Sequence, residues 1–143
     1  MTTKEYLGQV KMYDNKINKE LEELAYLREL AKGVSSVSTS NVKVKSSGDK
    51  DLLSKRVVKI AELESKIDDM VDNYIEKRRT ILEQIHNLDS ETEKTVLHEF
   101  FFNGKTIDEI AGQVGYSTRN TYNIYSSALI NFEQKYKKTY TKL

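Results

Sequence analysis

The sequence predicts an all-α protein: a long N-terminal helical hairpin or coiled coil, followed by a compact unit of three short helices. Three observations support this fold class. The 143 residues include no proline and six glycines, so little interrupts a helix. Apolar residues in residues 1–32 and 51–87 recur every three or four residues, which is the period of a helix with one apolar face. Cap and stop residues after position 88 then divide the chain into short segments.

The composition limits the classes of protein to consider. Apolar residues make up 38% and charged residues 31%, a balance that favours helices with solvated faces over a deep core. No cysteine is present, which excludes disulfides and thiolate metal sites and permits a reducing cytoplasm. The N-terminus lacks the apolar stretch of a secretory signal, and no run approaches the roughly 18 apolar residues of a membrane span. We therefore expect a cytoplasmic protein that does not contact membranes.

The N-terminal half contains two amphipathic segments with a polar segment between them. Residues 1–32 form the first predicted helix, and Gly33 is its expected stop. Residues 33–50 are rich in Ser, Thr, Asn, Gly and Lys and are interpreted as a flexible linker. Residues 51–87 form the second predicted helix, which is too long for a small C-terminal domain to cover.

The apolar seam of the second helix must therefore pack against the first helix, a second copy of itself, or both. We expect a homodimer through these helices, which would hold two copies of the C-terminal unit at a fixed separation. In the first helix the seam comprises Tyr6, Val10, Tyr13, Ile17, Leu21, Leu24, Leu27 and Ala31. In the second it comprises Leu53, Val57, Ile60, Leu63, Ile67, Met70 or Val71, Tyr74, Ile81 and Ile85.

Residues 88–143 contain three helix starts and two stops, which predict a compact tri-helical unit. The expected N-caps are Asp89 or Ser90 for the first helix, Thr106 for the second and Ser117 for the third. Ser90 and Thr106 are each followed three residues later by Glu, as in a capping box. Gly104 and Gly115 supply the left-handed stops. The third helix is expected to run to about residue 136.

The segment "TIDEIAGQVGYSTRNTYNI" has the spacing of a helix-turn-helix, a motif whose second helix enters the DNA major groove. Gly115 lies at the turn, and Ala111 is small where the second helix must approach closely. Thr121 stands where Val or Ile is usual. The positions expected to hold the two helices together are Ile110, Val114, Tyr116 and Ile124.

The block from about residue 88 to 132, with its cap at Thr106, resembles region four of sigma factors. The complete layout is similar to phage late-gene transcriptional regulators of the ArpU/RinA type, above all in "EFFFNGKT" and "STRNTYNIYSSAL". The resemblance implies a phage- or prophage-encoded regulator that acts in a bacterial host cell. It would bind double-stranded promoter DNA upstream of packaging or late genes.

Charge is divided unevenly within this block. Residues 89–116 contain two basic and six acidic residues, whereas residues 117–143 contain five basic residues and one acidic residue. Such a division would present a basic side to nucleic acid, although short windows also segregate charge by chance. In an activator, the acidic stretch would be a candidate contact for bacterial RNA polymerase.

A helical wheel that starts at Ser117 separates an inner face from an outer face. Thr121, Ile124 and Ala128 form the inner face, with Tyr125 at its edge. The outer face suits a major groove, because arginine can pair with guanine O6 and N7, and asparagine with adenine N6 and N7. The candidate DNA-binding residues are Thr106, Ser117, Thr118, Arg119, Asn120, Tyr122, Asn123, Ser126, Lys135, Lys137 and Lys138.

Two other functions fit the same layout. A small terminase subunit also joins a helix-turn-helix to oligomerising helices, but it assembles into rings. A protein-interaction module would bind a host factor and no DNA. An enzyme is not expected, because the sequence has no phosphate loop, nucleophile elbow or paired-carboxylate motif.

Neither a metal nor a cofactor is expected. His86 and His98 are twelve residues apart and lack the spacing of metal ligands, so they are interpreted as structural or exposed. Phe100, Phe101 and Phe102 are expected in the core, with one of them partly exposed.

Overall fold

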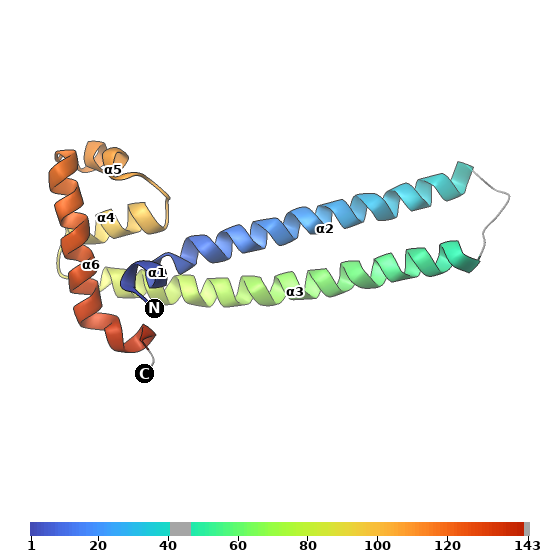
Figure 1. The fold of residues 1–143 in the computed structure, drawn as a ribbon, viewed down its shortest axis with the longest axis horizontal. Coiled ribbons are helices and arrows are strands. Elements are labelled where there is room, and N and C mark those ends of the chain that lie inside the picture. Colours follow the sequence, from blue (N-terminus) through green and yellow to red (C-terminus); the bar gives the residue numbers. More distant parts are fainter. Residues whose placement is uncertain (41–46, 142–143) are drawn as a thin grey trace. The chain divides into compact units, whose positions relative to one another are not determined.

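The computed structural model describes residues 1–40 and 47–141, and all regular structure in this part of the chain is helical. This confirms the all-α class. In order, the helices of the described residues are α1 (Thr3–Leu7), α2 (Gln9–Ser40), α3 (Ser47–His86), α4 (Glu91–Phe101), α5 (Ile107–Val114) and α6 (Thr118–Tyr140), as Figure 1 shows.

The chain divides into two compact units. Unit 1 comprises Met1–Asp14 and Tyr74–Leu143, and unit 2 comprises Asn15–Asn73. The sequence placed the boundary of the C-terminal domain at residue 88. Unit 1 also contains the N-terminus and the last three turns of α3, because side chains from these segments complete its core.

The core of unit 1 joins the two ends of the chain. The Tyr6 ring stacks on the Tyr140 ring at 4.4 Å between centroids, and the Tyr6 hydroxyl donates to Gln84 Oε1 at 2.7 Å. Thr3 Oγ1 lies 2.7 Å from the Tyr140 hydroxyl. These contacts explain why α6 continues to Tyr140 instead of ending near residue 136. The buried core comprises Tyr6, Leu7, Val10, Ile81, Ile85, Leu88, Val96, Leu97, Phe101, Ile110, Tyr125, Ala128 and Phe132.

Helices α4, α5 and α6 begin at predicted caps, and α5 ends at the predicted Gly115, whereas α4 ends at Phe101, before Gly104. Ser90, Thr106 and Ser117 are the N-caps of α4, α5 and α6, and each side chain accepts a hydrogen bond from a backbone N–H three residues later. Gly104 and Gly115 adopt φ of 67° and 80°, the left-handed region that side chains with a Cβ disfavour. The two predicted capping boxes, at Ser90 and Thr106, are not formed to the same extent.

The box at Thr106 is complete, whereas the box at Ser90 is only half formed. The carboxylate of Glu93 does not cap the helix. It accepts two hydrogen bonds from Asn131 Nδ2, at 2.8 and 3.1 Å, and so links α4 to α6.

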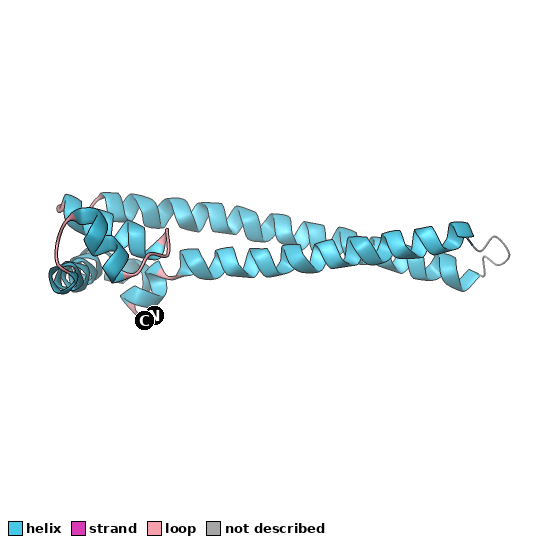
Figure 2. Cartoon of the chain, turned by 90° about the horizontal axis from the view of Figure 1, so that it is seen from above, coloured by secondary structure: helices cyan, strands magenta, loops and turns pink. Residues whose placement is uncertain are grey.

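In unit 2, α2 and α3 lie side by side and run in opposite directions (Figures 1 and 2). Ile17 and Leu24 of α2 and Ile67 of α3 are buried. Lys66 Nζ lies 3.1 Å from Glu20 Oε1, and Arg28 Nη2 lies 3.7 Å from Glu64 Oε2. The sequence left open whether the apolar seam of the second helix packs against the first helix or against a second copy. In the structure, α3 packs against α2 of the same chain.

Two predicted seam residues are exposed. Val57 is 54% exposed and Leu21 is 44% exposed. On α3 the neighbouring Arg56 is half-buried in place of Val57. Its Nη1 donates to the Leu30 carbonyl at 3.2 Å. Its aliphatic stem can cover apolar surface while the guanidinium finds a polar partner, so the arginine takes the place predicted for valine.

The limits of the N-terminal helices also differ from the prediction. The first predicted helix is interrupted at Gly8, although the Gly8 N–H still bonds to the Lys4 carbonyl at 2.9 Å. Helix α2 then continues past Gly33 to Ser40, and α3 begins at Ser47. The predicted linker at 33–50 is thus helical at both ends, and 41–46 lie outside the described residues. A glycine inside a helix costs only about 1 kcal/mol relative to alanine, which a long helix tolerates.

Candidate nucleic-acid interface

Helices α5 and α6 are joined by a tight turn. Helix α5 ends at Gly115, whose N–H bonds to the Ala111 carbonyl at 3.0 Å, and the Tyr116 N–H bonds to the same carbonyl at 3.2 Å. Ser117 then accepts from the Asn120 N–H at 3.1 Å and starts α6. The left-handed glycine and the serine cap therefore fix the direction in which α6 leaves the turn.

The inner face of α6 is centred on Tyr125, not on Ile124. Thr121 and Tyr125 are buried, whereas Ile124 is half-buried. Tyr125 packs against Phe100 at 4.7 Å between ring centroids and against Phe101 at 6.1 Å. The aromatic residues at the end of α4 thus draw Tyr125 into the centre of the interface. Burial raises the pKa of its phenol.

The three residues near the turn that were predicted to pack between the helices differ in their burial. Ile110 is buried and Val114 is half-buried, but Tyr116 is 46% exposed. Tyr116 directly follows the left-handed Gly115. Among the phenylalanines, Phe101 is buried, whereas Phe100 and Phe102 are both half-buried.

The outer face of α6 carries the side chains that sequence analysis favoured for base recognition. Arg119, Asn120 and Asn123 are exposed, and Tyr122 is 56% exposed. None of the side-chain hydrogen bonds or ion pairs among the described residues involves Arg119, Tyr122 or Asn123. Their donors and acceptors are thus available to a ligand.

Ser126, another candidate, is less accessible than its neighbour. It is half-buried, while Ser127 is exposed. Since the inner face is centred on Tyr125, the outer face turns towards Ser127, which sequence reasoning missed. Ser127 lies four residues after Asn123, so the helical period would have found it once the inner face was known.

Three of the predicted residues take part in holding the helices together. Thr106 and Ser117 use their hydroxyls as N-caps, and the Thr106 hydroxyl also donates to Glu109 Oε1 at 3.1 Å. The Thr118 hydroxyl donates to Asp108 Oδ1 at 2.9 Å. This bond ties the first turn of α6 to the first turn of α5, so Thr118 positions the outer face.

The predicted lysines near the C-terminus differ in their availability. Lys135 Nζ donates to the Asn87 carbonyl just after α3, where a cation favourably meets the negative end of the helix dipole. Lys137 Nζ lies 3.4 Å from Glu133 Oε1, with both side chains largely exposed. Lys138 is exposed. Lys137 and Lys138 can therefore supply attraction to phosphates, whereas Lys135 already serves the fold.

A shallow hollow of about 400 Å³ lies beside the outer face, between the N-terminus of α4 and α6. Its lining is mostly polar and uncharged. The lining residues are Ser90, Thr92, Glu93, Tyr116, Asn120, Asn123, Ile124 and Ser127. The first three come from outside the predicted motif, and no local sequence pattern connects them to α6.

The connection between α4 and α5 is held by a charged network around Glu99. Lys105 Nζ lies 2.8 Å from Glu99 Oε2, and Asn103 Nδ2 donates to the same oxygen at 3.1 Å. Lys105 Nζ also donates to Gln113 Oε1 at 2.7 Å. The hydrogen bonds from Lys105 and then Asn103 lower the pKa of Glu99 to about 2.

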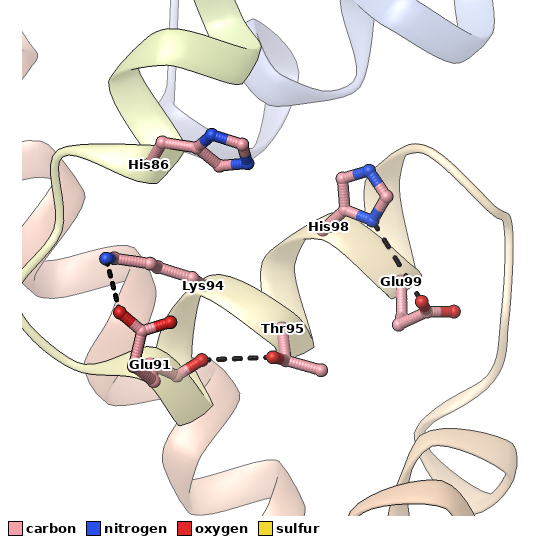
Figure 3. A pocket seen from close by; sticks show the side chains of 6 residues that line it. All are labelled: His86, Glu91, Lys94, Thr95, His98 and Glu99. Atoms are coloured by element: carbon pink, nitrogen blue, oxygen red, sulfur yellow. Dashed lines mark hydrogen bonds and ion pairs between the residues drawn. The ribbon is translucent and has the colours of Figure 1, made fainter.

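A second pocket, also of about 400 Å³, lies between the end of α3 and α4 (Figure 3). His86 and His98 both line it, but its other charges are already paired: Lys94 Nζ lies 2.8 Å from Glu91 Oε1. His98 stacks on Phe102 at 5.0 Å between centroids. Within residues 1–40 and 47–141, no group of three or more His, Cys, Asp or Glu side chains could hold a metal ion.

Comparison with protein-family models, curated proteins and solved structures gave no match to this chain. In the part of the chain that the structure describes, no helix combines the length and apolar character needed to cross a membrane.

Proposed function

We propose that this chain is a sequence-specific DNA-binding transcriptional regulator, with α5 and α6 as a helix-turn-helix and α6 as the recognition helix. One observation carries the proposal. The outer face of α6 directly after the turn is exposed, nearly uncharged and rich in side chains that donate and accept hydrogen bonds.

The chemistry of this face suits base edges. Arg119 can direct two N–H groups to guanine O6 and N7, and the Asn123 amide can both donate and accept at adenine. Phosphate contacts would come from exposed cations outside this face, such as Lys138, because phosphates position a protein without specifying sequence.

The resemblance to ArpU/RinA-type regulators supports a narrower proposal, an activator of phage late or packaging genes that acts in the bacterial cytoplasm as a homodimer. For contact with RNA polymerase, Asp89 is the best acidic candidate, since it is exposed. Glu91, Glu93 and Glu99 are unsuitable because they bond to Lys94, Asn131 and Lys105. An Asp89→Asn variant that still activates transcription would remove this contact.

The test of DNA binding is fluorescence anisotropy with DNA from upstream of the encoding phage's late genes, compared with scrambled DNA over a range of salt. We expect tight, sequence-dependent binding whose log–log salt slope is about −0.9 per phosphate contacted. Arg119→Ala should weaken specific binding by about 1–3 kcal/mol and relax specificity at one base. Arg79→Ala is the matched control, because Arg79 is an exposed arginine of α3.

The same titration distinguishes the protein-interaction alternative. Tyr122 and Ile130, which are 56% and 55% exposed, are side chains that a protein partner could bury. Weak binding, equal for both DNAs and unchanged by Arg119→Ala, would contradict DNA recognition and favour that alternative.

A further inference from the structure

The outward side of α3 in unit 2 carries a run of small, exposed side chains. Ser54, Ala61 and Ser65 are exposed, and Val57 and Val58 are 54% and 53% exposed. At 100° per residue all five lie within about 60° of Ala61. We call this group the Ala61 face. Small side chains let a second helix approach closely, because the distance between packed helices depends on the side chains at the contact.

Charge along α3 changes sign at Ala61. Residues 50–60 contain four basic residues and one acidic residue, and residues 62–72 contain five acidic residues and one basic residue. The basic residues of the first block are Lys50, Lys55, Arg56 and Lys59. The acidic residues of the second are Glu62, Glu64, Asp68, Asp69 and Asp72. The two blocks are of equal length and of opposite sign.

This arrangement is complementary to an antiparallel copy of itself. If two α3 helices cross at Ala61 in opposite directions, Lys50 of one helix lies opposite Asp72 of the other. At 100° per residue both lie within about 20° of Ala61, and both are exposed in the single chain. Arg56 and Glu64 do not contribute, because they bond to the Leu30 carbonyl and to Arg28 of α2. A parallel pair would place like charges together, which is unfavourable. A closed two-fold contact of this kind uses the same surface on both partners.

We propose that the Ala61 face is the docking surface for a second copy of this chain, with the two α3 helices antiparallel and a two-fold axis at Ala61. This docking proposal rests on the proposed function only in the expectation that the chain forms a homodimer. Its tests use no DNA, so the dimer and the DNA-binding proposal can fail separately.

The first test is the mass of the full chain in solution by sedimentation equilibrium. The wild-type chain should be a dimer. Ala61→Glu should raise its dissociation constant at least about a hundredfold, because two carboxylates would meet at the axis. Ala25→Glu is the matched control, since Ala25 is an exposed alanine of α2. Circular dichroism checks that both variants remain helical.

The second test uses the absence of cysteine from the chain. Ala61→Cys should form a disulfide-linked dimer under mild oxidation, because closely packed helices bring Cα atoms on the axis within about 4.4–6.8 Å. Ala25→Cys should not. Mixing the Ser54→Cys and Asp68→Cys proteins should give a crosslinked heterodimer, since these positions are opposite each other in the proposed register.

Three results would overturn the proposal. These are a monomeric wild-type chain, a ring of many copies, and a dimer that survives Ala61→Glu while Ala61→Cys crosslinks no more than Ala25→Cys. A dimer that meets both tests supports the Ala61 face whether or not the chain binds DNA.

Discussion

The Glu99 side chain stabilises the connection between α4 and α5, directly before the candidate DNA-binding motif. Its carboxylate lies 2.8 Å from Lys105 Nζ and accepts from Asn103, so it spans the left-handed Gly104 between α4 and α5. The pKa of Glu99 falls from 4.5 to about 2 as a result. A carboxyl whose pKa is lower in the folded state stabilises that state above its unfolded pKa.

We therefore predict a specific loss of stability in acid. The contribution of Glu99 should be complete above about pH 4.5 and should disappear as the pH falls to about 2. Glu99→Gln should be less stable than the wild type at neutral pH, and the two should converge near pH 2. Urea unfolding at successive pH values measures the difference. Glu83→Gln, at an exposed glutamate of α3, is the control, and an equal pH-dependent loss there would contradict a special role for Glu99.

Single residues near the motif also show the limit of sequence reasoning. Thr121 departs from the usual Val or Ile, yet it is fully buried and its hydroxyl donates to the Ser117 carbonyl at 2.9 Å. A local bond thus satisfies the polar atom. The half-burial of Ser126 follows from the packing of Phe100 and Phe101 of α4 against Tyr125, which no residue within α6 reveals.

At the scale of elements, the starts of α4, α5 and α6 and the stop of α5 could be predicted because caps are local, whereas the end of α6 depends on contacts with the N-terminal segment. A serine or threonine that bonds to an N–H three residues later and a glycine at positive φ each act within one turn. The end of α2 could not be predicted in this way, since Gly33 stops a helix only when the chain adopts the left-handed conformation there.

Gly112 and Gly115 allow a direct test of the difference between a glycine inside a helix and a glycine at positive φ. Gly115 has φ of 80°, whereas Gly112 lies inside α5, and a Cβ added at either would meet no atom within 4 Å. Gly115→Ala should destabilise unit 1 by about 1–2 kcal/mol, because alanine disfavours left-handed backbone. Gly112→Ala should stabilise it by about 0.5–1 kcal/mol.

Urea unfolding followed by the near-ultraviolet signal of tyrosine suits this comparison, because eight of the nine tyrosines belong to unit 1. Changes of the same sign in both variants would show that the conformation at Gly115 does not control the turn.

At the scale of the whole chain, the sequence predicted the helical class but not the composition of unit 1. Periodicity identifies which face of a helix is apolar, but it does not identify the partner of that face. Tyr6 and Tyr140 are far apart in sequence and stack at 4.4 Å, and Phe132 lies 6.1 Å from Tyr6 between ring centroids. The predicted domain of residues 88–143 thus lacks part of its own core.

This leads to a prediction about a residue far from the motif. Tyr6→Ala should lower the free energy of unfolding of unit 1 by about 3–5 kcal/mol, as expected for loss of a buried aromatic side chain. It should also loosen the C-terminal turns of α6, which amide hydrogen exchange would detect. Tyr26→Ala is the control, because Tyr26 is 58% exposed in unit 2. If Tyr6→Ala left the stability of unit 1 unchanged, residues 88–143 would be self-sufficient, and the boundary predicted from the sequence would be the correct one.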